Sequence, residues 1–145
     1  MKESVKEKII GTWKLISWKY LDGDNEPVDF FGENPVGILT YDASGYMNAQ
    51  LMKSGRGNFV SESLTGGTAE EIKDAYLSYA AYWGKYYERT PGELIHEVEG
   101  SLFPNWVGHD EIRYGKIEGE YLTLSTPPIH AQGKKILFNV TWKRA

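Results

Sequence analysis

The chain has 145 residues and a formal net charge of −4, from 16 Lys and Arg against 20 Asp and Glu. Its 41% hydrophobic and 25% charged residues are ordinary values for a globular chain with a buried core, and its length predicts a single domain over residues 1–145. Cysteine is absent, which excludes a disulfide framework, a thiolate metal site and a cysteine nucleophile. Aromatic residues are abundant, with 10 Tyr, 5 Trp and 5 Phe.

The charge pattern also restricts the partners of the chain. An acidic sequence without a Lys or Arg block lacks the basic face that nucleic acids and anionic membranes require. No segment approaches the ~18 consecutive apolar residues of a membrane span. The opening sequence MKESVKEK is followed by no apolar stretch of the kind found in secretion signals. We therefore expect a cytoplasmic protein that binds neither nucleic acid nor membrane.

In the first third of the chain, apolar and polar residues alternate between clusters of Gly, Pro, Asn and Asp, as in an antiparallel all-β domain. A short helical turn is expected within residues 4–10. Strands are expected at 11–21, 36–41 and 46–52. The first strand ends at a polar turn over residues 22–25. A second turn, over residues 42–45, joins the next two strands as a hairpin.

The middle of the chain contains a helix signal. Thr68 and Glu71 have the spacing of a capping box, which satisfies free backbone N–H groups at the start of a helix. Apolar residues then recur at spacings of three and four, and they predict a helix over residues 69–81 with one apolar stripe. The residues of that stripe are Ile72, Ala75, Tyr76 and Tyr79.

The strand pattern resumes after the helix. Five further strands are expected at 82–89, 93–101, 110–118, 121–126 and 135–144. Eight sequential strands with mostly hairpin-length connections favour an antiparallel up-and-down barrel, in which closure removes exposed sheet edges. The helix then lies between the third and fourth strands. A barrel of this size holds about one small ligand; a two-sheet sandwich is the competing architecture.

Segments along nearly the whole chain carry a family resemblance. They occur in the order GTWKLISW, PVGILTYDASGYMNAQLM, YWGKYYE, HEVEGSLFPNWVGHDEIRY, LTLSTPP and VTWKR. In this order they resemble the bacterial and fungal lipocalin-like domain family, a group of small calycin-type barrels. The helix position and the lack of a long C-terminal helix and of disulfides differ from secreted lipocalins. The transport roles of secreted lipocalins are therefore not implied.

The resemblance also implies a role for both ends of the chain. Gly11 and Trp13 match the Gly-x-Trp motif that opens the first lipocalin strand. Trp142 and Arg144 lie near the C-terminus, where lipocalins place an Arg across that Trp at the closed base of the barrel. A guanidinium over an indole gains a cation–π contact. These four residues are expected to form the barrel base.

His96 is the first candidate for chemistry. In the strand expected at 93–101, Leu94, His96 and Val98 share one face if Glu97 and Glu99 face water. The alternation therefore places His96 inside the barrel. It is either a core histidine satisfied by a neighbouring hydroxyl or a residue that contacts a ligand or exchanges a proton with it.

Arg113 is the second candidate. If it points inward with Gly115 and Ile117, it is a buried cation that needs a carboxylate or a ligand anion as partner. Glu88 shares an inward phase with Gly84 and is the candidate internal partner. A fatty-acid-like or keto-acid ligand is the alternative partner.

Aromatic residues complete the expected pocket. Tyrosines that converge on His96 and Arg113 would line it with large apolar rings and a few placed hydroxyls. Trp106 is expected to cap the mouth of the barrel. The full set of expected ligand contacts is His96, Arg113, Tyr41, Tyr79, Tyr82, Tyr86 and Trp106.

Three functions remain open from the sequence. The leading hypothesis is a barrel that holds one small, largely apolar molecule. The alternative is an isomerase, a cyclase or a similar enzyme on a natural-product-like substrate, with His96 or a tyrosine as acid or base. A third hypothesis is a barrel filled by its aromatics that acts through its surface or as a homodimer, which predicts no cavity. The spacing of His96, His109 and His130 demands no metal, and we expect no cofactor.

Overall fold

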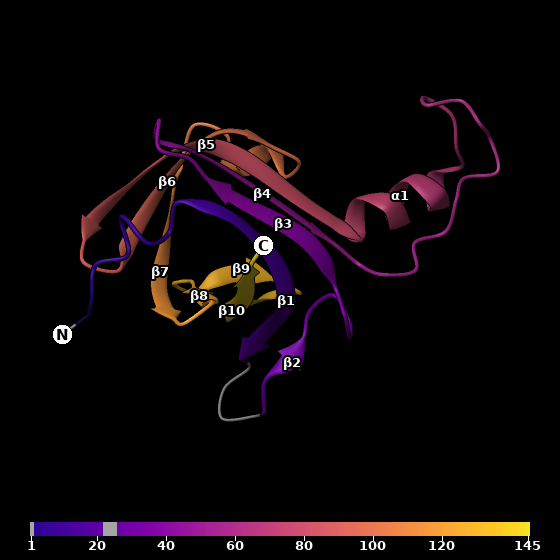
Figure 1. The fold of residues 1–145 in the computed structure, drawn as a ribbon. Helices are drawn as coiled ribbons and strands as arrows, with labels where there is room; N and C mark the ends of the chain where they lie inside the picture. The colour runs from indigo at the N-terminus through magenta and orange to yellow at the C-terminus, as the bar shows by residue number, and fades with distance from the viewer. Residues whose placement is uncertain (1, 22–25) are drawn as a thin grey trace.

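The computed structural model describes residues 2–21 and 26–145, so the turn predicted at 22–25 lies outside the described residues. The fold is a closed antiparallel barrel of eight strands (Figure 1). In order around the barrel these are β1 (Gly11–Leu21), β3 (Val36–Tyr41), β4 (Tyr46–Met52), β5 (Tyr79–Thr90), β6 (Glu93–Ser101), β7 (Asp110–Glu118), β8 (Tyr121–Ser125) and β10 (Lys134–Arg144). Pairing between β1 and β10 closes the barrel. The predicted barrel is confirmed and the sandwich is excluded.

Three short elements were not predicted. β2 (Val28–Asp29) pairs with β1, and β9 (Ile129–Ala131) pairs with β10. A single 3-10 turn, η1 (Pro104–Trp106), follows β6. Elements of two or three residues are too short to display an alternating pattern, so the sequence carries no periodic signal for them.

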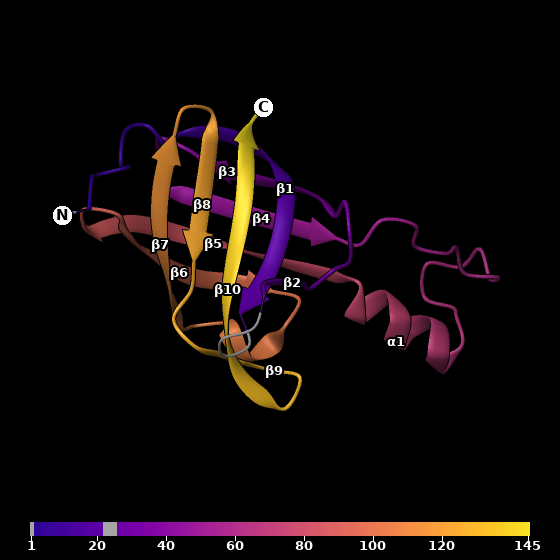
Figure 2. The same cartoon turned by 90° about the horizontal axis from the view of Figure 1, so that it is seen from below.

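The helix α1 (Ala69–Leu77) starts where the capping box predicts. The Thr68 hydroxyl accepts from the Glu71 N–H at 3.1 Å, and the Glu71 carboxylate accepts from the Thr68 N–H at 2.8 Å. The predicted end at residue 81 is wrong, because residues 79–81 pair with β4 as the start of β5. The helix stands beside the barrel in both views (Figures 1 and 2).

The apolar stripe predicted for α1 is not buried against the barrel. Ile72 is 52% exposed and Tyr76 is 43% exposed, and no residue of the helix is buried. Tyr79, the last member of the predicted stripe, belongs to β5 instead. Strand pairing with β4 therefore outweighs the helical periodicity at this position.

The chain before β1 packs against one end of the barrel. The Ile9 N–H donates to the Val5 carbonyl at 2.8 Å, which closes one helical turn. Val5 and Ile9 are both buried in the core, because a spacing of four residues places them on one side of the turn. The Trp13 indole N–H donates to the Ile9 carbonyl at 2.9 Å and ties this turn to β1.

Arg144 lies across the same end of the barrel. Its guanidinium carbon is 3.9 Å from the centroid of the Trp13 ring. Its Nη1 donates to the Ile10 carbonyl at 2.8 Å, and its Nη2 donates to the Lys8 carbonyl. Gly11 has a φ of +130°, and a Cβ there would lie 2.9 Å from Nη1 of Arg144. Glycine therefore allows the guanidinium to reach the ring and the carbonyls together. The C-terminus and β9 lie at opposite ends of the barrel (Figure 2).

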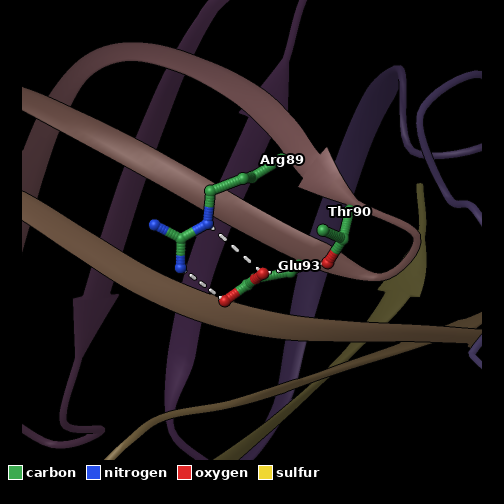
Figure 3. A network of polar contacts seen from close by, with 3 residues as sticks. All are labelled: Arg89, Thr90 and Glu93. Carbon is green, nitrogen blue, oxygen red and sulfur yellow. Dashed lines mark hydrogen bonds and ion pairs between the residues drawn. The ribbon is translucent and has the colours of Figure 1, made fainter.

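A polar cluster fixes the hairpin between β5 and β6 (Figure 3). Arg89 Nη2 lies 2.6 Å from the Glu93 carboxylate, and the Thr90 hydroxyl donates to the same group at 2.9 Å. The hydrogen bond from Arg89 is the main cause of the lowered pKa of Glu93. Exposed ion pairs of this kind contribute little to stability. The cluster therefore acts mainly on the geometry of the turn.

We expect Arg144→Ala to destabilise the fold by about 2 kcal/mol or more, since it removes a cation–π contact and two charge-assisted hydrogen bonds. Urea unfolding of both proteins measures this change. Lys143→Ala is the matched control, because Lys143 only approaches the exposed ring of Tyr121 at 5.9 Å. It should change the free energy of unfolding by less than about 0.5 kcal/mol. Equal effects of the two substitutions would contradict the role of Arg144.

Candidate functional site

A cavity of about 190 Å³ lies within the barrel. Aromatic side chains make up much of its wall: Trp18 from β1, Phe30 after β2, Phe103 and Trp106 around η1, and Phe138 and Trp142 from β10. The aliphatic part of the wall consists of Leu39, Ala49, Leu51, Ala80, Leu124, Ile129, Ala131 and Val140. The polar lining residues are Tyr82, Arg113, Thr126 and His130.

One side of the cavity is a packed group of aromatic rings. The ring centroid of Trp18 lies 4.7 Å from Phe30 and 5.6 Å from Phe138. Phe30 and Phe138 meet edge to face with their centroids 5.0 Å apart. Rings that hold one another at such distances form a stable wall with flat faces and polar edges.

Most of this wall was missed from the sequence. For Phe138 and Trp142 a signal was present, because they share a strict alternation with Ile136 and Val140. Trp18 is hidden by a register shift between Leu15 and Ser17, which reverses the inward phase of β1 after its first half.

Arg113 forms the cationic end of the cavity. Its side chain is almost fully buried on β7, and its Nη1 donates to the Ile112 carbonyl at 2.9 Å. Its guanidinium lies 5.5 Å from the centroid of the Trp106 ring and 5.8 Å from that of Tyr82. Arg113 Nη1 is 4.0 Å from the Glu111 carboxylate. Burial raises the pKa of Glu111, and the charge of Arg113 partly offsets this shift.

The predicted pairing of Arg113 with Glu88 is wrong. The Glu88 carboxylate accepts hydrogen bonds from the Ser4 hydroxyl at 2.6 Å, the Val5 N–H at 2.7 Å and the Gly92 N–H at 3.0 Å. It therefore anchors the N-terminal segment. Strand phase predicts the face on which a residue lies but gives no height along the barrel axis, and the carboxylate facing Arg113 comes from Glu111.

His96 is fully buried between two tyrosines. Its Nε2 lies 2.7 Å from the Tyr41 hydroxyl, and its Nδ1 lies 2.8 Å from the Tyr82 hydroxyl. Burial, with a contribution from the charge of Arg113, holds the pKa of His96 well below its usual value. The imidazole is therefore neutral at physiological pH and makes a hydrogen bond at each ring nitrogen.

The residues expected to contact a ligand fall into three groups. Tyr82, Trp106 and Arg113 line the cavity. Tyr41 and His96 are not among the lining residues, and they connect to the cavity through Tyr82. The remaining two tyrosines lie elsewhere.

Tyr86 donates from its hydroxyl to the Asp42 carbonyl at 2.8 Å and packs against the ring of Tyr41. Tyr79 donates to the Gln50 side-chain oxygen at 2.7 Å, and its ring lies below the Arg56 guanidinium. Neither lines the cavity. Tyr79 alternates with Tyr82 along β5, which places it on the outer face of the strand.

The four residues expected at the barrel base fall into two groups. Gly11, Trp13 and Arg144 meet at the closed end of the barrel. Trp142 is buried and lines the cavity.

Other features of the described residues are less suited to a site. A depression of about 930 Å³ on the outside of β7 and β8 is lined largely by polar and charged residues such as Lys2, Lys116 and Glu118. Within residues 2–21 and 26–145, no three His, Asp or Glu side chains lie together as a metal site would need. No helix among them has the length and apolar character to cross a membrane.

Comparisons with known proteins agree with this geometry. A family model described as a lipocalin-like domain matches residues 10–145. The chain is also similar to the 4'-hydroxy-3'-methoxypropiophenone carrier protein ppsC of Aspergillus oryzae. The two are 34% identical over 106 residues, which cover 68% of this chain and 96% of the relative. Both similarities support a ligand-binding role.

We expect the free energy of unfolding to fall as the pH drops below about 6.5. The folded pKa of His96 is depressed, so the unfolded chain binds more protons in this range. The contribution of His96 to stability is fully present above the pKa of this histidine in the unfolded chain. It declines by up to about 1.4 kcal/mol per pH unit below that pKa. His96→Gln should flatten this dependence, as measured by urea unfolding across the range.

The ring signals of His96 in the folded wild type provide a second measurement, which does not depend on how well the variant folds. They should stay unchanged across the same pH range in NMR spectra. Titration of His96 near its ordinary pKa would contradict its assignment as a neutral, buried group.

Proposed function

Because the chain belongs to the lipocalin-like domain family, we propose that it binds one small, largely apolar molecule inside the barrel and releases it unchanged. The observation that carries this proposal is the internal cavity, with aromatic walls and one cationic end at Arg113. A few placed polar groups in an apolar pocket are the usual composition of a small-molecule site.

The size of the cavity limits the ligand. An apolar cavity of about 150 Å³ holds benzene, whereas sites for drug-sized molecules begin near 300 Å³. The volume of about 190 Å³ therefore suits a single aromatic ring with a short side chain. A long-chain fatty acid would extend well beyond such a space. The relative from Aspergillus oryzae is named as a carrier of a propiophenone, which is a single-ring aryl ketone.

The walls favour a flat aromatic ligand. Trp18 and Phe138 lie on one side of the cavity, and Trp106 lies near Arg113 at the polar end. Ring-on-ring contacts with offset or edge-to-face geometry add to the free energy of apolar burial, which amounts to about 25 cal/mol per Å². Arg113 then orients the polar end of the ligand. The cavity also contradicts the hypothesis of a barrel filled by its own aromatics.

Filling the cavity should weaken ligand binding. Ala80 lines the cavity, whereas its neighbour Ala81 alternates to the outer face of β5. We expect Ala80→Phe to weaken the binding of propiophenone at least tenfold, because its ring occupies the ligand's space. Ala81→Phe is the matched control and should bind as the wild type does. Isothermal titration calorimetry measures both affinities, and equal binding by the two variants would contradict an internal site.

A thermal shift gives an independent readout. A ligand at about a hundredfold excess over its wild-type Kd should stabilise the wild type by about 2.7 kcal/mol and Ala80→Phe by about 1.4 kcal/mol or less. The ligand should be recovered intact after incubation. Chemical conversion of the ligand by the wild type, lost in Tyr82→Phe, would instead support the enzyme hypothesis.

A further inference from the structure

We infer that Tyr41, His96 and Tyr82 form a hydrogen-bonded relay with one fixed direction, which makes the Tyr82 hydroxyl a donor to a neutral carbonyl oxygen in the cavity. The inference rests on the proposed function and names its ligand class, a small aryl ketone or a similar neutral carbonyl compound. His96 acts in it as a positioning residue through Tyr82.

The first step concerns the imidazole. A neutral histidine has one N–H and one bare nitrogen, so one ring nitrogen donates and the other accepts. His96 has a tyrosine hydroxyl at each nitrogen, at 2.7 Å and 2.8 Å. One tyrosine must therefore donate to the ring, and the other must accept from it.

The second step fixes the direction. Tyr41 is fully buried, and within the described part of the chain its hydroxyl has no hydrogen-bond partner besides His96 Nε2. If Nε2–H donated to Tyr41, the proton of Tyr41 itself would be buried without an acceptor, at a cost of about 1–3 kcal/mol. Tyr82 lines the cavity, where a ligand or water can accept its proton, and Tyr41 does not, so Tyr41 is the tyrosine that donates to Nε2. His96 carries its proton on Nδ1 and donates it to the Tyr82 oxygen.

The third step follows at Tyr82. Its oxygen accepts from His96, so its own proton is free to be donated elsewhere. Tyr82 lines the cavity together with Arg113. A hydroxyl that accepts one hydrogen bond donates the next more strongly. Burial raises the pKa of Tyr82, partly offset by the charge of Arg113, so the phenol keeps its proton at physiological pH.

The charges around Arg113 favour a neutral acceptor. The Glu111 carboxylate, only 17% exposed, lies 4.0 Å from the guanidinium of Arg113 and already provides a negative charge beside it. A ligand carboxylate would approach this second carboxylate in a buried site, where like charges repel strongly. A carbonyl oxygen can accept from Tyr82 and Arg113 without this repulsion.

Three probes of similar size test the ligand class: propiophenone, propylbenzene and 3-phenylpropanoate. We expect calorimetry to show the ketone binding about tenfold more tightly than the hydrocarbon, the worth of about one hydrogen bond, and more tightly than the carboxylate. In Tyr82→Phe the ketone should lose this advantage while propylbenzene binds as before. The unchanged hydrocarbon affinity is the control that the cavity remains intact.

The remaining outcomes distinguish a failure of the inference from a failure of the proposed function. Equal affinities for ketone and hydrocarbon in the wild type, or tightest binding of the carboxylate, would overturn the inference and leave the proposed binding function in place. Failure of all three probes to bind would overturn the proposed function itself.

The direction of the relay has its own spectroscopic test. In protein labelled with ¹⁵N-histidine, the ring nitrogens of His96 should report a protonated Nδ1 and a bare Nε2. A purely structural histidine between two hydroxyls permits either tautomer. A protonated Nε2 would overturn the relay, because Tyr82 would then donate to His96 and not to the ligand.

Discussion

The pairing of β1 with β10 is the constraint on which the rest of the structure depends, because it turns a sheet into a closed wall around an interior. The same two strands supply Trp13 and Arg144 to one end of that wall, where the guanidinium lies 3.9 Å from the ring centroid. The N-terminal turn packs against this end. The cavity lies towards the other end, where its lining includes residues of η1 and β9.

The hydrogen bonds of His96 with Tyr41 and Tyr82 give this interior a defined polar group beside the cavity. A buried histidine without partners would cost several kcal/mol, whereas His96 has a hydroxyl at each ring nitrogen. In the inferred relay the network links the core to the cavity, because the burial of Tyr41 selects the tautomer of the neutral His96 and leaves the spare proton on Tyr82. Arg113 adds a second donor beside it, and its charge is already faced by Glu111.

Much of this structure could be predicted from the sequence where the signal is local. Strand alternation placed His96 inside the barrel, and the capping box at Thr68 located the start of α1. The features that the sequence did not predict depend on contacts between segments that are distant in the chain. The end of α1 is determined by pairing with a distant strand, and Trp18 turns inward through a register shift. The choice of Glu111 over Glu88 depends on height along the barrel, which strand phase does not encode.

The central claim is that a single-ring carbonyl compound lies inside the barrel with its oxygen at Tyr82 and Arg113. A crystal structure of the protein grown with propiophenone tests this claim most directly. The account predicts the aromatic ring of the ligand between Trp18 and Trp106, with the ketone oxygen within hydrogen-bond distance of the Tyr82 hydroxyl. A ligand bound in the outer depression along β7 and β8, or one with its carbonyl turned away from Tyr82, would contradict it.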